Sequence, residues 1–392
     1  MPWKEISVMD ERRKFIIRAL DPREEFRSLC REYGISTKTG YKWKERFLAL
    51  GVEGLKDQSR RPKGSNQRLI EEVVCEIIKL KLSHRRWGPK KIQDMYGRMH
   101  ESEVLPSLST FNRVLAKAGL VDHRRRRKQT IRQGMPSKVE VEKPNDLWTV
   151  DFKGWWYTPS KQKCEPLTVR DQYSRYILSL RGVSNSKTEA IKAEFERLFK
   201  ENGLPRAIRS DNGPPFASCR SMLNLTKLSV WWLSLGIRLD RIEPGKPYQN
   251  GAHERLHKDI KQELQGMIEG DLTAHQAAFD QWRDEFNTER PHEALGMQTP
   301  SNVYQKSEIG YDEAAVEIIY PYGYIQRLVN DRGLICLYQN KVFISNAFEG
   351  YHLGLKLEAK DTYGVWFDHL RIGQIDLTTF KFKAVAIEEL NQ

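Results

Sequence analysis

The sequence of 392 residues has no uncharged apolar run of about 18 residues, the length at which a segment becomes a candidate membrane-spanning helix. Its first residues, MPWKEISVMDERRKF, are charged where a secretory signal peptide needs an apolar stretch. Both absences argue against an integral membrane protein. We therefore expect a chain that works in the cytoplasm and has no membrane partner.

Cysteine is also scarce, with five residues scattered along the chain. No Cys-x-x-Cys motif occurs, and no cysteine lies beside a histidine pair at the spacing of zinc ligands. This pattern argues against a disulfide-rich fold and against a zinc-finger module. We expect reduced, buried thiols at Cys30, Cys75, Cys164, Cys219 and Cys336.

Acidic residues are outnumbered in one part of the chain only. Residues 1–144 contain 34 Lys and Arg against 19 Asp and Glu, whereas the remainder contains 31 against 33. A hydrophobic content of 39% is ordinary for a folded protein. A length of 392 residues predicts several domains. Because Lys and Arg displace counterions from a phosphate backbone, the asymmetry favours a nucleic-acid partner over a merely basic protein.

The basic part begins with a pattern typical of a helix-turn-helix. Apolar residues recur at helical spacing over 8–20 and 24–34, and a third helix starts after Ser36 or Thr37, either of which can cap it. The second helix of such a motif enters the major groove of DNA. The residues predicted to contact DNA from its first turns are Lys38, Thr39 and Lys42.

The pattern then repeats over 68–83, 88–99 and 107–120, where Ser107 or Ser109 can cap the last helix. Thr110, Asn112 and Arg113 are the predicted DNA contacts of this second module. Any three-helix bundle can show such a pattern once. Two in tandem on the basic part favour DNA binding.

A run of basic residues follows the second module. It is either a solvated surface loop or, as its position between DNA-binding modules and a further domain favours, a segment that tracks phosphates. The residues concerned are Arg124, Arg125, Arg126 and Arg127.

From Leu147 the sequence changes to strand patterns that then alternate with helices, which predicts a mixed sheet flanked by helices. Asp151 lies in an otherwise apolar strand, a costly place for a charge unless it binds a cation. Asp211 ends a strand before Asn-Gly, and Glu254 follows Asn250-Gly251 on the first turn of a helix. Carboxylates that converge from separate elements are suited to magnesium, and two such ions can catalyse phosphoryl transfer.

Each carboxylate has a structural alternative. Aspartate before Asn-Gly is common in turns, and glutamate early in a helix interacts favourably with the helix dipole. The combination of the three is what points to a catalytic site.

The strings LWTVDFKG, AIRSDNGPPF, PGKPYQNGAHERLHKDIKQEL and FNTERPHEALGMQTPSNVY together resemble the DDE transposases of bacterial insertion sequences over roughly residues 146–305. The resemblance implies a ribonuclease-H-like core, shared with retroviral integrases, and maps the catalytic, metal-binding acids onto Asp151, Asp211 and Glu254. It also implies two magnesium ions as cofactors, for which manganese can substitute.

Forty-two residues separate Asp211 from Glu254, a longer spacing than in many integrase-type relatives. Glu243 is the alternative, but it precedes a proline, whereas Glu254 lies in the Gln-Asn-Gly string. Lys258 and Lys261 share a helical face with Glu254, and we predict that they contact DNA. The alternative is a simple Glu–Lys helix pair. His257 can touch substrate or orient a neighbour, and we rank DNA contact first.

Residues 318–383 contain short strand-like runs with Gly and Asn turns, which predict a small five-stranded barrel. Related enzymes often carry a Src-homology-3-like barrel there. The predicted segments are a helix-turn-helix module at 1–58, a second at 66–122, a basic linker at 123–145, the core at 146–305 and the barrel at 318–385.

The resemblance implies an enzyme that binds the terminal inverted repeats of its element, hydrolyses a phosphodiester and transfers the strand to target DNA. Its partners are then double-stranded DNA of element ends and target and further copies of itself, in a dimer or higher oligomer. It would act in the bacterial cytoplasm at the nucleoid. The alternatives are a non-catalytic DNA-binding regulator derived from a transposase and a ribonuclease-H-type nuclease, which leaves two helix-turn-helix modules unexplained.

Overall fold

The computed structural model describes residues 7–57, 70–102, 104–121, 139–184, 187–218, 223–242, 251–313 and 318–385. The chain divides into two compact units, Met1–Ile70 and Glu71–Gln392. Among the described residues, no helix is long and apolar enough to cross a membrane.

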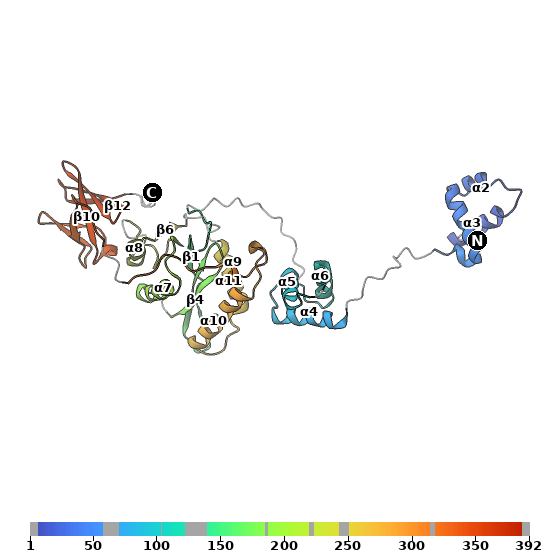
Figure 1. Ribbon diagram of the computed structural model, residues 1–392, viewed down its shortest axis with the longest axis horizontal. Coiled ribbons are helices and arrows are strands. Elements are labelled where there is room, and N and C mark those ends of the chain that lie inside the picture. Colours follow the sequence, from blue (N-terminus) through green and yellow to red (C-terminus); the bar gives the residue numbers. More distant parts are fainter. Residues whose placement is uncertain are drawn as a thin grey trace, which may run out of the picture. The chain divides into compact units, whose positions relative to one another are not determined.

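The first unit is a small helical bundle. It contains α1 (Val8–Ala19), α2 (Phe26–Glu32), α3 (Thr37–Leu50) and the 3-10 helix η1 (Gly51–Leu55) (Figure 1). Ser36 caps α3, because its hydroxyl accepts a hydrogen bond from the Thr39 amide at 3.2 Å. Gly40 brings α3 close to α2, since a Cβ at this position would lie 2.6 Å from the Cys30 Sγ. The predicted helix-turn-helix is confirmed.

A second helical group opens the other unit. It consists of α4 (Glu71–Ser83), α5 (Pro89–Met99) and α6 (Leu108–Lys117). Ser107 caps α6 by accepting from the Thr110 amide. The core of the group includes Ile92, Tyr96 and Phe111, each at most 1% exposed.

The centre of this unit is a mixed sheet. Its strands run β4-β3-β1-β5-β6, with the short β2 also paired to β3. β1 pairs antiparallel with β3 but parallel with β5, and β5 pairs parallel with β6. The bounds are Trp148–Phe152 for β1, Trp156–Tyr157 for β2, Lys163–Asp171 for β3, Ile177–Val183 for β4, Ala207–Ser210 for β5 and Arg238–Arg241 for β6. The predicted mixed sheet is confirmed.

Helices cover both faces of this sheet (Figure 1). On one face α7 (Thr188–Asn202) and α8 (Lys227–Ser234) pack on an apolar cluster that includes Trp148 and Val150. On the other face lie α9 (Gly251–Glu263) and α10 (Leu272–Thr288), followed by η3 (Glu293–Leu295) and α11 (Pro300–Val303).

Helix α9 is held to the sheet by one apolar stripe. Leu256 and Ile260 of α9 and Leu264, directly after it, lie at i, i+4 and i+8 and are at most 7% exposed. Burying each of these side chains contributes about 1.5–3 kcal/mol. The stripe fixes which way the remaining faces of α9 point, and so fixes the position of Glu254.

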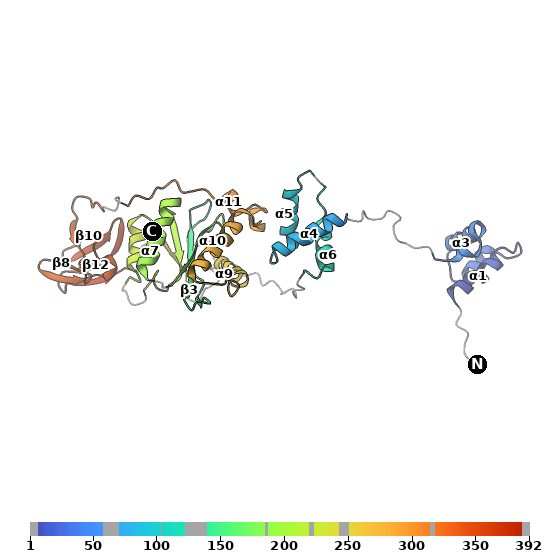
Figure 2. The same ribbon diagram turned by 90° about the horizontal axis from the view of Figure 1, so that it is seen from below.

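The C-terminal strands form two antiparallel sheets (Figure 2). Five strands pair in the order β13-β12-β11-β10-β7, and β8 pairs with β9 alone. The bounds are Ile325–Leu328 for β7, Leu334–Leu337 for β8, Asn340–Phe343 for β9, His352–Ala359 for β10, Thr362–Phe367 for β11, Leu370–Asp376 for β12 and Lys381–Ala384 for β13, with the 3-10 helix η4 (Asn346–Phe348) between β9 and β10.

This arrangement differs in detail from the predicted five-stranded barrel. The run 333–345, which the sequence pattern predicts to be a single strand, is a hairpin, because Tyr338 and Gln339 adopt left-handed backbone angles (φ of 46° and 67°) that reverse the chain in two residues. The strand that ends the sheet, β13, was not predicted.

The expectation of buried thiols was wrong for two cysteines. Cys30 and Cys164 are buried, whereas Cys75 and Cys336 are exposed. Cys336 lies between the buried Ile335 and Leu337 of β8, so its side chain points to the opposite, exposed face of the strand, and Cys75 lies on the exposed side of α4. Cys219 lies outside the described residues.

Candidate active site

Asp151 reaches the α9 side of the sheet because side chains alternate along β1. Trp148 and Val150 point into the apolar cluster beneath α7 and α8, so Thr149 and Asp151 face the other way. Across the ladder, Asp151 is paired with Thr168 on β3. The strand therefore presents a half-buried carboxylate to the first turns of α9.

Asp211 is brought beside Asp151 by the parallel pairing of β1 with β5. Each aspartate lies two residues beyond the paired residues Thr149 and Arg209. The amide of Gly213 donates to the Asp211 Oδ1 at 3.2 Å, and a Cβ on this glycine would lie 3.1 Å from the Oδ2. The tight loop leaves the Asp211 carboxylate exposed at the end of the strand.

Glu254 is the third carboxylate, on the first turn of α9 and exposed. Burial, and after it the negative charges of Asp211 and Glu254, raises the pKa of Asp151 to about 7. Because the charges of Asp211 and Glu254 raise the pKa of Asp151, both lie close enough to repel its carboxylate. A divalent cation among them would turn this repulsion into binding, and carboxylate oxygens are the donors that magnesium prefers.

A network of hydroxyls and imidazoles lies under the carboxylates. The Thr168 hydroxyl donates to the Asp151 carbonyl at 3.0 Å and lies 3.1 Å from the His253 Nδ1 and 2.9 Å from the His257 Nε2. The His253 Nε2 lies 2.6 Å from the Thr149 hydroxyl. The network joins β1, β3 and α9 at the level of Asp151.

The two histidines differ in what they can offer a metal. Three possible ligand atoms lie within 4.8 Å of one another: a carboxylate oxygen of Asp151 and one ring nitrogen each of His253 and His257. Both nitrogens of His253 are engaged by threonine hydroxyls, so it has no lone pair directed at an ion. The His257 Nδ1 lies 3.9 Å from the Asp151 Oδ2, and burial, with Lys153 nearby, lowers the pKa of His257 to about 4. His257 is therefore neutral at pH 7 and can orient or supplement the carboxylate site.

The predicted DNA contacts of α9 lie on two sides of the helix. Lys258 and Lys261 are exposed on the same face as Glu254. His257 is half-buried and turned toward Thr168 and Asp151 instead of the outer face.

The predicted contacts of the helical modules are largely exposed. Lys38, Lys42, Asn112 and Arg113 are exposed, whereas the hydroxyls of Thr39 and Thr110 are also bonded to the capping serines of their helices. The residues Arg124, Arg125, Arg126 and Arg127 lie outside the described residues.

Several residues of the site were missed from the sequence. His253 was not predicted, although its i, i+4 spacing from the predicted His257 is a signal for a shared helical face. Thr149 lies two residues before Asp151 and so shares its face of the strand. Thr168 and Lys153 had no local signal, because their proximity to α9 depends on how the sheet is assembled.

Five stretches of the sequence match models of known protein families. Residues 11–63 match a helix-turn-helix domain and residues 39–115 match a homeodomain-like domain. Residues 141–247 and 235–300 match two integrase core domains. Residues 326–383 match the C-terminal domain of IS481 family transposases.

Similar curated proteins come from insertion elements. An uncharacterized 31.7 kDa protein of IS407 from Burkholderia multivorans is 26% identical over 250 residues, covering 62% of this chain and 85% of that protein. An uncharacterized 39.2 kDa protein of IS476 from Xanthomonas euvesicatoria is 26% identical over 242 residues, covering 59% of this chain and 64% of that protein.

Similar solved structures are retroviral. The catalytic core domain of HTLV-2 integrase with magnesium is 19% identical, with 42% of this chain and 98% of that chain covered and a TM-score of 0.33. The simian T-cell lymphotropic virus intasome with a regulatory subunit of PP2A is 16% identical, with 75% and 96% covered and a TM-score of 0.35.

Proposed function

We propose, on the premise that the chain is an integrase-core transposase of the insertion-sequence type, that it cleaves and joins DNA at the ends of its own mobile element. The observation that carries the proposal is that Asp211, at the end of β5, and Glu254, on α9, act electrostatically on Asp151 of β1. The pKa of Asp151, raised to about 7 by burial and by the other two charges, supports their proximity.

The three carboxylates form the proposed metal site. Two magnesium ions, when bound, would activate the attacking oxygen and stabilise the leaving oxygen of an in-line displacement at phosphorus. In the first step the oxygen of water attacks a phosphodiester and the DNA 3′-oxygen leaves as a hydroxyl. In the second step that hydroxyl attacks a phosphodiester of the target, and the target's own 3′-oxygen leaves.

The protein's residues bind and orient the reactants. Lys258 and Lys261 lie on the Glu254 face of α9, where ammonium groups can contact the phosphates on either side of the scissile bond. The Thr168 hydroxyl fixes the β1 backbone at Asp151 and the imidazole of His257 at once. The exposed first turns of α3 and α6 are suited to recognition of element ends, which requires at least two copies of the chain for two ends.

Strand transfer with a labelled element end tests the proposal. The end sequence is taken from paired inverted repeats in the DNA that flanks the gene. Asp151→Asn, Asp211→Asn and Glu254→Gln should each abolish hydrolysis and joining in magnesium or manganese while leaving DNA binding intact. Asp331→Asn, an exposed aspartate of the C-terminal part, is the matched control and should react as the parent does.

Two other outcomes would overturn the proposal. Specific binding of the ends without any cleavage by the parent would identify a DNA-binding regulator. Preferential cleavage of RNA in an RNA–DNA hybrid would identify a ribonuclease-H-type nuclease.

A further inference from the structure

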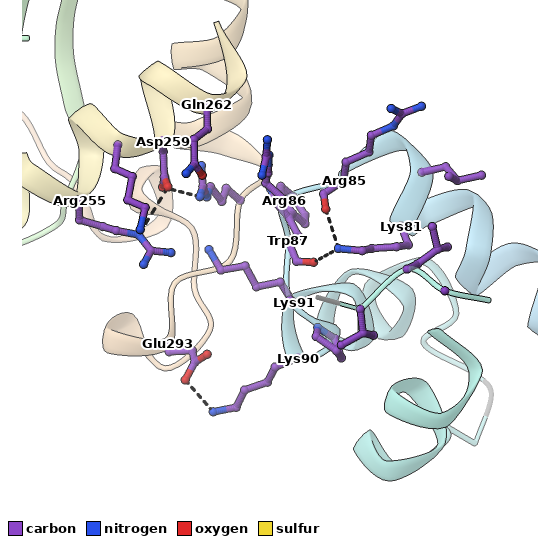
Figure 3. A pocket seen from close by; sticks show the side chains of 18 residues that line it. Lys81, Arg85, Arg86, Trp87, Lys90, Lys91, Arg255, Asp259, Gln262 and Glu293 are labelled. Atoms are coloured by element: carbon purple, nitrogen blue, oxygen red, sulfur yellow. Dashed lines mark hydrogen bonds and ion pairs between the residues drawn. The ribbon is translucent and has the colours of Figure 1, made fainter. Parts of the chain in front are cut away.

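We infer that a basic pocket between the turn that joins α4 to α5 and the outer side of α9 binds the phosphate backbone of double-stranded DNA. The pocket has a volume of about 660 Å³, and eight of its lining residues are Lys or Arg against one Asp and one Glu (Figure 3). The inference rests on the proposed function and extends the DNA contact from the Glu254 face of α9 to the α4–α5 turn.

The α4–α5 turn is held rigidly by buried contacts. The Lys81 ammonium donates to the carbonyls of Arg85 and Trp87 at 2.6 and 2.7 Å. The Trp87 ring is 3% exposed and stacks on His84 with centroids 3.9 Å apart. The turn therefore presents Arg85 and Arg86 from a preorganised backbone, which reduces the entropy lost when they bind a ligand.

Four of the Lys and Arg side chains that line the pocket have no carboxylate partner among the described residues. Lys90 is paired with Glu293 at 3.0 Å, and Arg290 with Asp259 at 2.6 Å. Arg85, Arg86, Lys91 and Lys258 line the same pocket and form no ion pair within the described part of the chain. Burial, and after it the neighbouring Arg290, lowers the pKa of Lys91 to about 8. A phosphate group in the pocket would relieve this concentration of positive charge.

The pocket adjoins the catalytic face of α9. At about 100° per residue, Lys258 lies ~40° and Arg255 ~100° around the helix from Glu254. Lys258 thus belongs both to the Glu254 face and to the pocket lining. A DNA backbone that reaches Glu254 can continue along α9 into the pocket without leaving the protein surface.

Direct contacts bring the two sides of the pocket together. The His84 Nδ1 lies 3.0 Å from a Glu285 carboxylate oxygen at the end of α10. Arg98 donates to the Met297 carbonyl at 2.6 Å, and Lys90 pairs with Glu293 of η3. The pocket is therefore built jointly by the second helical group and the sheet-bearing core.

The chemistry of the lining favours a backbone over a base or a mononucleotide. Arginine guanidinium groups bind phosphate oxygens in a fork. Trp87, the aromatic residue of the lining, is buried and stacked, so it offers no face to a base. Contacts to phosphates position a duplex without reading its sequence.

Binding of a duplex of arbitrary sequence by the full chain, without metal, tests the inference. Anisotropy of a fluorescent 30-base-pair duplex is measured between about 50 and 200 mM salt, since each phosphate contact contributes about −0.9 to the slope of log K against log salt. Arg85→Ala combined with Arg86→Ala should make the slope less steep by about one to two. Arg206→Ala combined with Arg332→Ala removes two other exposed arginines and should leave the slope unchanged.

A double-mutant cycle tests whether the α4–α5 turn and α9 bind the same phosphates. It compares the turn variant (Arg85→Ala with Arg86→Ala), Arg255→Ala on α9, and the two combined. If the turn and α9 hold the same phosphates, the combined loss of affinity should be at least threefold smaller than the product of the separate losses. A slope for the turn variant equal to that of the parent, or losses that simply multiply, would overturn the inference. So would displacement of the duplex from the pocket by a mononucleotide at equal affinity.

The DNA-binding test of the pocket and the strand-transfer test of the carboxylates can fail independently. Failure at the pocket would leave strand transfer by the parent untouched. Failure of the proposed function would appear as loss of metal-dependent cleavage while the pocket still contributed to the salt slope. Thermal unfolding of each variant checks that the fold is retained.

Discussion

Replacing Asp151 with asparagine should stabilise the metal-free protein at neutral and alkaline pH and remove its response to magnesium. Asparagine has nearly the shape of the protonated aspartate but never carries its charge. Since the folded-state pKa of Asp151 is raised from 3.8 to about 7, ionising this carboxylate works against folding.

The sign and size follow from linkage. A raised pKa gives stability that is fully present below the unfolded pKa and is lost as the pH rises through the folded pKa. The shift to about 7 corresponds to about 4 kcal/mol at 1.36 kcal/mol per pKa unit. Because 26% of the Asp151 side chain is exposed, solvent screens part of this, and we expect about 2–4 kcal/mol.

The assay is chemical denaturation followed by tryptophan fluorescence, which reports on the core through the buried Trp148 and Trp232. The free-energy difference between Asp151→Asn and the parent should grow between about pH 4 and pH 7 and stay constant above that. Magnesium should stabilise the parent and not the variant. A difference that does not change between pH 4 and pH 8 would contradict a pKa of Asp151 that burial and the neighbouring carboxylates raise.

Three further predictions concern other parts of the chain. Thr168→Val should lower the free energy of unfolding by about 1–3 kcal/mol, because it leaves two imidazole nitrogens without the hydroxyl, and Thr168→Ser should restore most of it in the same denaturation assay. Gly40→Ala should destabilise the first unit by about 1–3 kcal/mol, because its Cβ would lie 2.6 Å from the Cys30 Sγ; thermal unfolding of that unit followed by circular dichroism checks this, and an unchanged midpoint would contradict the close packing of α3 on α2. Deleting residues 1–122 should abolish specific binding of element ends in a gel-shift assay with competitor DNA, and retained specificity would show that recognition lies elsewhere.

Features set by neighbours in the sequence could be predicted. The capping serines Ser36 and Ser107 follow from the residues that begin each helix. The face shared by Glu254, Lys258 and Lys261 follows from helical periodicity. Asp151 was recognisable because a charged side chain in an otherwise apolar strand is energetically costly unless it binds a cation.

Features set by the assembled sheet could not be predicted. The parallel pairing of β1 with β5 puts Asp151 and Asp211 side by side, although the intervening chain forms three other strands and a helix. The bond between His253 and Thr149 joins residues 104 positions apart. The hairpin at Tyr338 and Gln339 was missed because neither residue is one that usually adopts left-handed angles.

We propose that Asp151, Asp211 and Glu254 act together on DNA phosphodiesters. The decisive measurement is strand transfer of a labelled element end in magnesium, compared between the parent, the three amide variants and Asp331→Asn. Joined products are expected from the parent and from Asp331→Asn, and none from Asp151→Asn, Asp211→Asn or Glu254→Gln. Joining by any of these three variants at the rate of the parent would contradict it.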